Sequence, residues 1–172
     1  MAESRILVVE DSDTQRAIYK ALLEEKGYVV IEARDGEEGV KKAMSEHPDV
    51  ILTDMSMPKL DGFGLTKALK SDEKTKFIPI ICISSTYQDI AMKIKALLEA
   101  GAEEYFYAPQ SAEELAIKVA VMLRIRKIYL DLINSNKQLK LINDVCIDRE
   151  LKMIELKNKI KSLEEELAKY KK

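Results

Sequence analysis

The sequence predicts an α/β domain with a doubly wound, five-stranded parallel sheet, followed by a long C-terminal helix that forms a coiled coil. Three observations support this. Short apolar runs alternate with helical patterns five times, acidic residues follow two of these runs, and no Gly or Pro occurs between Gln110 and Lys172. Strands that alternate with helices favour parallel pairing through right-handed crossovers. We interpret residues 1–123 as one domain and residues 124–172 as a coiled-coil helix continuous with its last helix.

Five short runs, most of them rich in β-branched residues, have the length and composition of buried strands. They lie at residues 5–9, 28–33, 50–53, 78–83 and 104–107. The segments between them repeat apolar residues at helical spacing, and most begin with residues that cap helices or form turns. We expect helices from Ser12 or Asp13 to Gly27, from Gly36 through Met44, from Phe63 to Leu69, from Ile90 to Gly101, and after Ser111.

The composition is that of a globular chain with room for one domain and an appendage. The chain has 172 residues, of which 47% are hydrophobic, and a net charge of −2, so no strong charge attracts it to nucleic acid or to a membrane. Cys82 and Cys146 lie far apart, which favours free thiols in a reducing compartment over a disulfide. No signal peptide or run of membrane-spanning length is visible. We therefore expect a soluble, cytoplasmic protein.

Acidic residues follow two of the expected strands, at the edge where open α/β sheets place their chemistry. Glu10 and Asp11 come directly after residues 5–9, and Asp54 follows residues 50–53. Carboxylates that meet there repel one another, and a hard cation such as Mg²⁺ relieves that repulsion. Ser84 directly follows the fourth run, and its hydroxyl group can donate a hydrogen bond to a phosphoryl oxygen at this edge. The alternative is that each acid merely caps the helix or turn that follows it.

From Leu115 onward the chain carries apolar residues at alternating spacings of three and four. One seam position is apolar in every heptad: Ile125, Leu132, Leu139, Cys146, Met153, Ile160 and Leu167. The second is polar only at Ser135 and Arg149 and also contains Ile128, Ile142, Leu156, Leu163 and Tyr170. This pattern is typical of a coiled coil. Because an unpaired helix would expose the stripe, we expect a homodimer with parallel helices, with a higher oligomer or a further partner domain as alternatives.

Four segments of the sequence together form a combination that is highly specific for one protein family. They are residues 8–12 (Val-Val-Glu-Asp-Ser), 54–62 (Asp-Met-Ser-Met-Pro-Lys-Leu-Asp-Gly), 78–85 (Ile-Pro-Ile-Ile-Cys-Ile-Ser-Ser) and 101–105 (Gly-Ala-Glu-Glu-Tyr). With them, residues 4–123 resemble the receiver domain of two-component response regulators. The resemblance implies the CheY-like fold, with strand order 2-1-3-4-5. It also implies that a sensor histidine kinase or a phosphotransfer protein is the partner.

The resemblance further implies a role for each residue of the site. Asp54 accepts the phosphoryl group, Ser84 is the switch hydroxyl, and Tyr105 is the aromatic residue that changes rotamer with it. The ligands of Mg²⁺ are Glu10, Asp11, Asp54 and the backbone carbonyl of Ser56. We expect no enzyme activity beyond self-phosphorylation from a phosphodonor and self-dephosphorylation. An Mg²⁺-dependent hydrolase of outside substrates is an alternative without a substrate-pocket motif.

The chain departs from the family pattern at one position. Receivers usually end the fifth strand with Lys-Pro, whereas this chain has Ala108-Pro109. An alanine removes a charge-assisted contact to the phosphoryl group, of a kind that contributes roughly 1.5–3 kcal/mol. Lys59 is a candidate for partial replacement, although a solvated loop lysine is the simpler interpretation. The departure also leaves open a pseudo-receiver, an interaction and dimerisation module that is not switched by phosphorylation.

The C-terminal helix is interpreted as the output device. Residues 124–172 contain thirteen Lys and Arg against eight Asp and Glu, and these charges are interspersed rather than concentrated as in a basic DNA-binding helix. We therefore expect contact with neither nucleic acid nor membrane. The heptads continue to the end of the sequence, which suggests an N-terminal piece of a longer protein. A signal at Asp54 is expected to rotate the paired helices or change their register.

Overall fold

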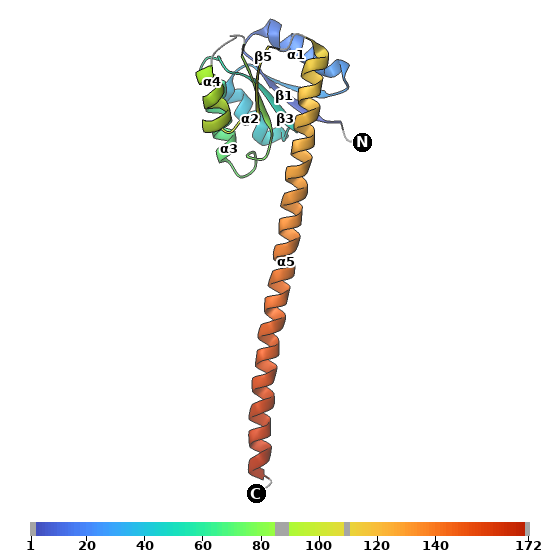
Figure 1. Cartoon of the computed structure of the whole chain (residues 1–172), viewed down its shortest axis with the longest axis vertical. Helices are drawn as coiled ribbons and strands as arrows, with labels where there is room; N and C mark the ends of the chain where they lie inside the picture. The colour runs from blue at the N-terminus through green and yellow to red at the C-terminus, as the bar shows by residue number, and fades with distance from the viewer. Residues whose placement is uncertain (1–2, 85–89, 109–110, 171–172) are drawn as a thin grey trace. The chain divides into compact units, whose positions relative to one another are not determined.

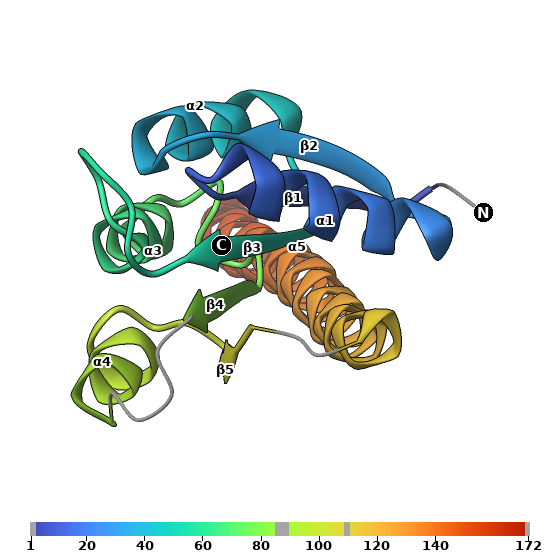
Figure 2. The same ribbon diagram turned by 90° about the horizontal axis from the view of Figure 1, so that it is seen from above.

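The structure, a computed structural model, describes residues 3–84, 90–108 and 111–170, with side chains described up to residue 165. The strands are β1 (Arg5–Val9), β2 (Val29–Ala33), β3 (Val50–Asp54), β4 (Ile80–Ser84) and β5 (Glu104–Tyr107). The helices are α1 (Asp13–Glu25), α2 (Gly36–Glu46), α3 (Gly62–Ser71), α4 (Ile90–Ile94), the π-helical η1 (Lys95–Glu99) and α5 (Ala112–Tyr170). Figure 1 shows these elements coloured along the chain. All strand pairs are parallel, in the order β2-β1-β3-β4-β5 (Figure 2). The predicted fold class is therefore confirmed.

The sheet is covered on both faces, because successive strand residues point to opposite sides. Leu7 and Val9 of β1 join a core cluster under α2, α3 and η1. Ile6 and Val8 join the other cluster, under α1 and the first turns of α5. Figure 2 shows this division, with α2, α3 and α4 on one side of the strands and α1 and α5 on the other. The doubly wound arrangement leaves the carboxyl ends of β1 and β3 side by side.

Short polar side chains begin the helices. The side chains of Ser12, Asp35 and Asp61 accept backbone hydrogen bonds at the N-termini of α1, α2 and α3. Ser12, rather than Asp13, is therefore the residue that caps α1. Gly27 ends that helix with a φ of 82°, a left-handed conformation that glycine adopts without steric cost.

Several element boundaries differ from the prediction, most of them by one or two residues, and two of the differences have a clear physical reason. β4 begins at Ile80 rather than at Ile78, because the Ile78 amide closes a turn with the Thr75 carbonyl at 2.8 Å. The helix predicted from Ile90 is α-helical only to Ile94 and continues as the π-helix η1. The amide of Ala100 donates to the carbonyl of Lys95 at 2.9 Å, a bond over five residues that the apolar spacing did not reveal.

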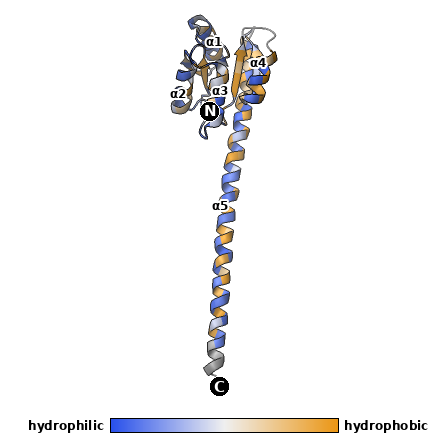
Figure 3. Cartoon of the chain, turned by 90° about the vertical axis from the view of Figure 1, so that its left-hand side faces the viewer, coloured by the Kyte–Doolittle hydropathy of each residue, from blue (hydrophilic) through white to orange (hydrophobic). Residues whose placement is uncertain are grey.

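The chain divides into two compact units, Met1–Leu130 and Asp131–Lys172. In the second unit, every side chain from Asn134 to Glu165 is exposed. Figure 3 shows hydrophobic and hydrophilic residues interspersed along this part of α5. Among the described residues, no helix combines the length and the apolarity that a membrane span requires. The predicted long helix is confirmed, and the coiled coil remains a prediction.

Candidate functional site

Three carboxylates meet at the carboxyl edge of the sheet, as the sequence predicted. Asp54 is the last residue of β3, and Glu10 and Asp11 directly follow β1, which pairs with β3. One ligand oxygen from each of the three side chains lies within 4.8 Å of the others. Glu10 is buried, Asp54 is half-buried and Asp11 is exposed. These acids do not cap the helices that follow, because Ser12 and Asp61 do so.

Backbone amides hold two of these carboxylates in place. The amide of Ser12 donates to Oε1 of Glu10 at 3.1 Å, and the amide of Ser56 donates to Oδ2 of Asp54 at 2.8 Å. The Met55 amide also donates to the Ile83 carbonyl at 2.9 Å, so pairing between β3 and β4 continues past Asp54. These bonds orient the Asp54 carboxylate at a fixed strand end.

The loop after β3 returns so closely to that strand that it requires a glycine. A Cβ atom on Gly62 would lie 2.3 Å from the carbonyl oxygen of Asp54. The amide of Gly62 donates to the carbonyl of Met55 at 3.2 Å, which closes the loop at its other end. The sequence Asp61-Gly62 thus provides a cap for α3 and the space in which Asp54 lies.

Burial and mutual repulsion disfavour ionisation of these acids. Burial raises the pKa of Glu10 to about 7, and the charges of Asp54 and Asp11 also raise it, against the lowering effect of the Ser12 amide. Burial raises the pKa of Asp54 as well, and the charge of Asp11 adds to this effect. A cation bound among the three carboxylates would remove this penalty, because it would favour their charged forms.

The donor set fits Mg²⁺. All three side chains offer carboxylate oxygens, the ligands that this hard cation prefers, and the cluster contains no Cys or His that would favour a softer metal. Asp11 is exposed beside the buried Glu10, so the site offers both fixed protein oxygens and access to water. The carbonyl of Ser56 stays a predicted ligand.

The acidic cluster opens into a cleft of about 290 Å³. Its lining consists of Glu10, Asp11, Ser12, Gln15, Tyr19, Asp54, Ser56, Ile83 and Ala108. Ala108 follows β5 and extends its pairing, since its amide donates to the carbonyl of Ser84 at 3.0 Å. The residue at the expected lysine position therefore does reach this cleft, and it brings only a methyl group.

Lys59 does not contribute a charge to this cleft. Its ammonium group lies 2.5 Å from Oδ2 of Asp35, on the loop after β2. The Asp35 side chain also accepts the Glu38 amide at 2.9 Å and so caps α2. The hypothesis that Lys59 replaces the missing lysine is not supported by this geometry.

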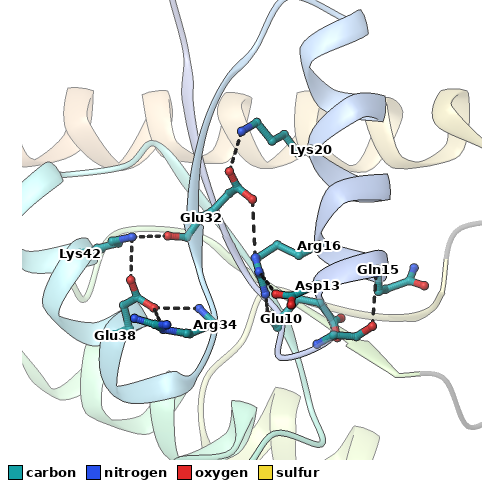
Figure 4. Close-up of polar contacts among 10 residues, drawn as sticks. Glu10, Asp13, Gln15, Arg16, Lys20, Glu32, Arg34, Glu38 and Lys42 are labelled. Carbon is teal, nitrogen blue, oxygen red and sulfur yellow. Dashed lines mark hydrogen bonds and ion pairs between the residues drawn. The ribbon is translucent and has the colours of Figure 1, made fainter.

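Nearby cations are engaged with other acids, as Figure 4 shows. Arg16 donates to the backbone carbonyl of Glu10 at 2.8 Å and forms ion pairs with Asp13 and Glu32. Lys20 pairs with the same Glu32 at 2.6 Å. These contacts connect α1 to the end of β1 and to β2. Arg16 contacts the backbone of Glu10, and Glu10 itself lines the cleft.

The two predicted switch residues lie on β4 and β5. Ser84 is the last residue of β4 and is buried, one residue beyond the pair formed by Ile83 and Asp54. Tyr105 is buried on the face covered by α3 and η1, and its ring meets that of Tyr107 edge-on, with centroids 6.3 Å apart. The adjacent residues 85–89 lie outside the described part of the chain.

Sequence reasoning missed two residues that line the cleft. Gln15 and Tyr19 both project from α1 into the cleft's lining. A signal was present, because Ser12, Gln15 and Tyr19 follow one another at spacings of three and four and so share one side of a helix. Tyr19 is the larger of the two and is buried.

Comparison with known proteins supports a single family. Residues 6–120 match the family described as response regulator receiver domain. Protein PilH of Pseudomonas aeruginosa is 37% identical over 120 residues, which cover 70% of this chain and 98% of PilH. The alkaline phosphatase synthesis transcriptional regulatory protein PhoP of Bacillus subtilis is 38% identical, over 70% of this chain and 48% of PhoP. The chain spans about half the length of several curated relatives of this kind.

A solved structure agrees with the sequence comparison. The signal receiver domain of a signal transduction histidine kinase from Syntrophus aciditrophicus is 35% identical, with a TM-score of 0.65. The match covers 70% of this chain and 90% of that domain.

Proposed function

Because the chain belongs to the family of response regulator receiver domains, we propose that Asp54 accepts a phosphoryl group and that the change passes into a dimeric coiled coil. The donor is a sensor histidine kinase or a phosphotransfer protein. The observation that carries this proposal is the convergence of Asp54 with Glu10 and Asp11 within 4.8 Å at the mouth of a cleft. A strand end holds the acceptor carboxylate, and two further acids lie beside it as candidate ligands of a metal ion.

In the proposed transfer, a carboxylate oxygen of Asp54 attacks the phosphorus of a phosphohistidine. An O–P bond forms while the N–P bond breaks, and the electron pair of the broken bond stays on the imidazole nitrogen. The imidazole takes a proton from solvent, and Asp54 carries an acyl phosphate. The amide of Ser56, 2.8 Å from Oδ2 of Asp54, fixes the carboxylate for this attack.

Glu10, Asp11, Asp54 and the Ser56 carbonyl would hold Mg²⁺ in this reaction. When bound, Mg²⁺ supplies positive charge that offsets the carboxylates and the oxygens of the phosphoryl group. The chain's own part is to place these oxygens together and to keep Glu10 buried. We propose no turnover of outside substrates, only self-phosphorylation from a phosphodonor and self-dephosphorylation.

The relay begins on β4 and β5. We propose that the Ser84 hydroxyl donates to the phosphoryl group and that Tyr105 then changes rotamer. Phe106, the next residue of β5, lies in the core cluster that contains Leu115 and Val119 of α5. A shift of β5 therefore acts directly on the base of α5.

The receiver's output is proposed to be a parallel homodimer of α5 helices. Apolar side chains at the seam positions are exposed, with Leu139 at 64%, Ile142 at 60% and Ile160 at 56% exposure. A second copy of the same helix presents the same stripe in register and covers it. The polar seam residues Ser135 and Arg149 weaken the pairing locally, which favours a change of register on signalling.

One observation favours a second function, a pseudo-receiver that acts only as an interaction module. Ala108 supplies no charge to the cleft, and Lys59 binds Asp35 instead. Ala108→Lys separates the two functions. If Ala108→Lys responds more strongly to phosphorylation than the parent does, the parent is a weakened switch. If the response to phosphorylation is unchanged, the interaction module is supported.

Intact-mass measurement tests the acceptor directly. The full chain is incubated with Mg²⁺ and excess acetyl phosphate, beside Asp54→Asn. A single phosphoryl adduct on the parent that is absent from the variant supports the proposal. No adduct on the parent, or an equal adduct on both proteins, contradicts it.

A further inference from the structure

Tyr19 enters the acidic cleft from the α1 side of the sheet. It is 3% exposed, and its side chain belongs to the core cluster that contains Ile83 and Phe106. It also lines the cleft together with Asp54 and Ala108. The Tyr19 side chain is therefore packed in the core and also lies at the edge of the cleft that contains the carboxylates.

Tyr19 and Ala108 are complementary in size. A lysine at position 108 would bring a four-carbon stem and an ammonium group into this cleft, whereas alanine leaves that space to its neighbours. Tyr19 is a large side chain that lines the same cleft. It therefore borders the space that a lysine at position 108 would enter.

The phenol of Tyr19 has the chemistry of a hydrogen-bond donor. Burial raises its pKa to about 12, a hydrogen bond with Gln15 lowers it, and the charges of Glu10 and Asp54 raise it. The phenol is thus protonated at neutral pH. A protonated phenol carries one O–H group that can donate a hydrogen bond.

We propose that the Tyr19 hydroxyl donates a hydrogen bond to the phosphoryl group on Asp54, and so replaces the donor that is lost with alanine at position 108. This inference rests on the proposed phosphoacceptor function. Hydrogen bonds to charged acceptors are stronger than neutral ones, and a donor held in the core needs little reorganisation. The cleft would thereby retain a donor without retaining a positive charge.

The test compares rates of phosphoryl uptake. The parent, Tyr19→Phe and Tyr28→Phe, all as full chains, are incubated with Mg²⁺ and acetyl phosphate and followed by intact mass. Tyr28 is a suitable control because it packs against the same core cluster and does not line the cleft. Tyr19→Phe is expected to slow uptake by about tenfold or more, the effect of losing one hydrogen bond to a charged group, while Tyr28→Phe matches the parent.

A double variant, Tyr19→Phe with Ala108→Lys, distinguishes lost donation from damaged packing. Lysine restores a donor, so uptake should recover towards the parent rate. If the parent takes up the phosphoryl group and Tyr19→Phe does so equally fast, the role of Tyr19 is wrong and the proposed function stands. If Tyr19→Phe is slow and the double variant stays slow, the role is wrong as well. A parent that takes up none overturns both.

Discussion

The ammonium group of Lys59 lies 2.5 Å from a carboxylate oxygen of Asp35, on the neighbouring loop. The Lys59 backbone has a φ of 66°, in the left-handed region, and the side chain is largely exposed. The pair lowers the pKa of Asp35, first through the hydrogen bond from Lys59. Lys59 belongs to the motif that begins at Asp54, but its side chain forms an ion pair with an acid on the loop after β2.

Lys59→Gln is accordingly expected to leave phosphoryl uptake unchanged. The substitution removes a charge that contacts Asp35 and does not line the acidic cleft. Time courses of adduct formation by intact mass, run beside the parent and Asp54→Asn, check this. If Lys59→Gln reacts as slowly as Asp54→Asn, Lys59 does contact the phosphoryl group, and the prediction is wrong.

Stability without metal should fall as pH rises through the range in which Glu10 titrates. Its pKa is about 7 in the folded protein against an ordinary 4.5, so between these values the folded state binds more protons than the unfolded state. The free energy of unfolding then decreases with rising pH. In Glu10→Gln the free energy of unfolding should change less with pH. Between the two pKa values of Glu10, the difference from the parent should be on the order of 1–3 kcal/mol.

Urea unfolding in the presence of a chelator, at several pH values, measures this slope. Adding Mg²⁺ should raise the stability of the parent most at high pH, where the carboxylates are charged, and should do so less for Glu10→Gln. Parallel pH curves for the two proteins would contradict the assignment of the shift to Glu10.

Gly62→Ala should destabilise the domain by about 1–3 kcal/mol, because its new Cβ would meet backbone that cannot move aside easily. That atom would lie 2.3 Å from the carbonyl oxygen of Asp54 and 3.0 Å from Cα of Met55. Gly64→Ala is the matched control, since its Cβ meets the flexible end of Leu60 at 2.6 Å. Thermal unfolding of the two variants compares the costs, and an equal loss in both would contradict this account of the loop.

A parallel, in-register dimer should form a disulfide between the Cys146 residues of two copies under a mild oxidant such as copper phenanthroline. Cys146 occupies a seam position and is exposed, whereas Cys82 is buried, so one thiol per chain is accessible. Non-reducing gel electrophoresis should show a covalent dimer that Cys146→Ser abolishes. A parent that stays uncrosslinked, or runs as a monomer in light scattering, would contradict parallel pairing.

The sheet and its acidic edge could be predicted because they depend on local patterns. Each buried strand is a short apolar run, and in a parallel sheet the residues that follow neighbouring strands must meet, so Asp54 could be placed beside Glu10 before the structure was known. The position of Ala108 at the cleft was instead implied by the resemblance to receiver domains, and the structure places Ala108 in the lining of that cleft.

The remaining features depend on contacts between distant segments. Tyr19 shares one side of α1 with Gln15, but the packing of α1 on the sheet is needed to show that this side borders the cleft. The partner of Lys59 is on another loop, and a lysine in a loop carries no sign of which acid it meets. The π-helical turn at Lys95–Glu99 arises from backbone bonding that the side-chain pattern does not reveal.

The rate of Cys146 cross-linking with and without phosphorylation tests most directly whether Asp54 controls the coiled coil. The full chain and Asp54→Asn are oxidised with Mg²⁺ present, each with and without acetyl phosphate, and the covalent dimer is followed over time. A rotation or change of register of the paired helices alters the separation of the two thiols. We therefore predict that adding acetyl phosphate changes the rate of cross-linking for the parent and leaves it unchanged for Asp54→Asn. Identical rates in a parent shown by intact mass to carry the phosphoryl group would contradict this prediction.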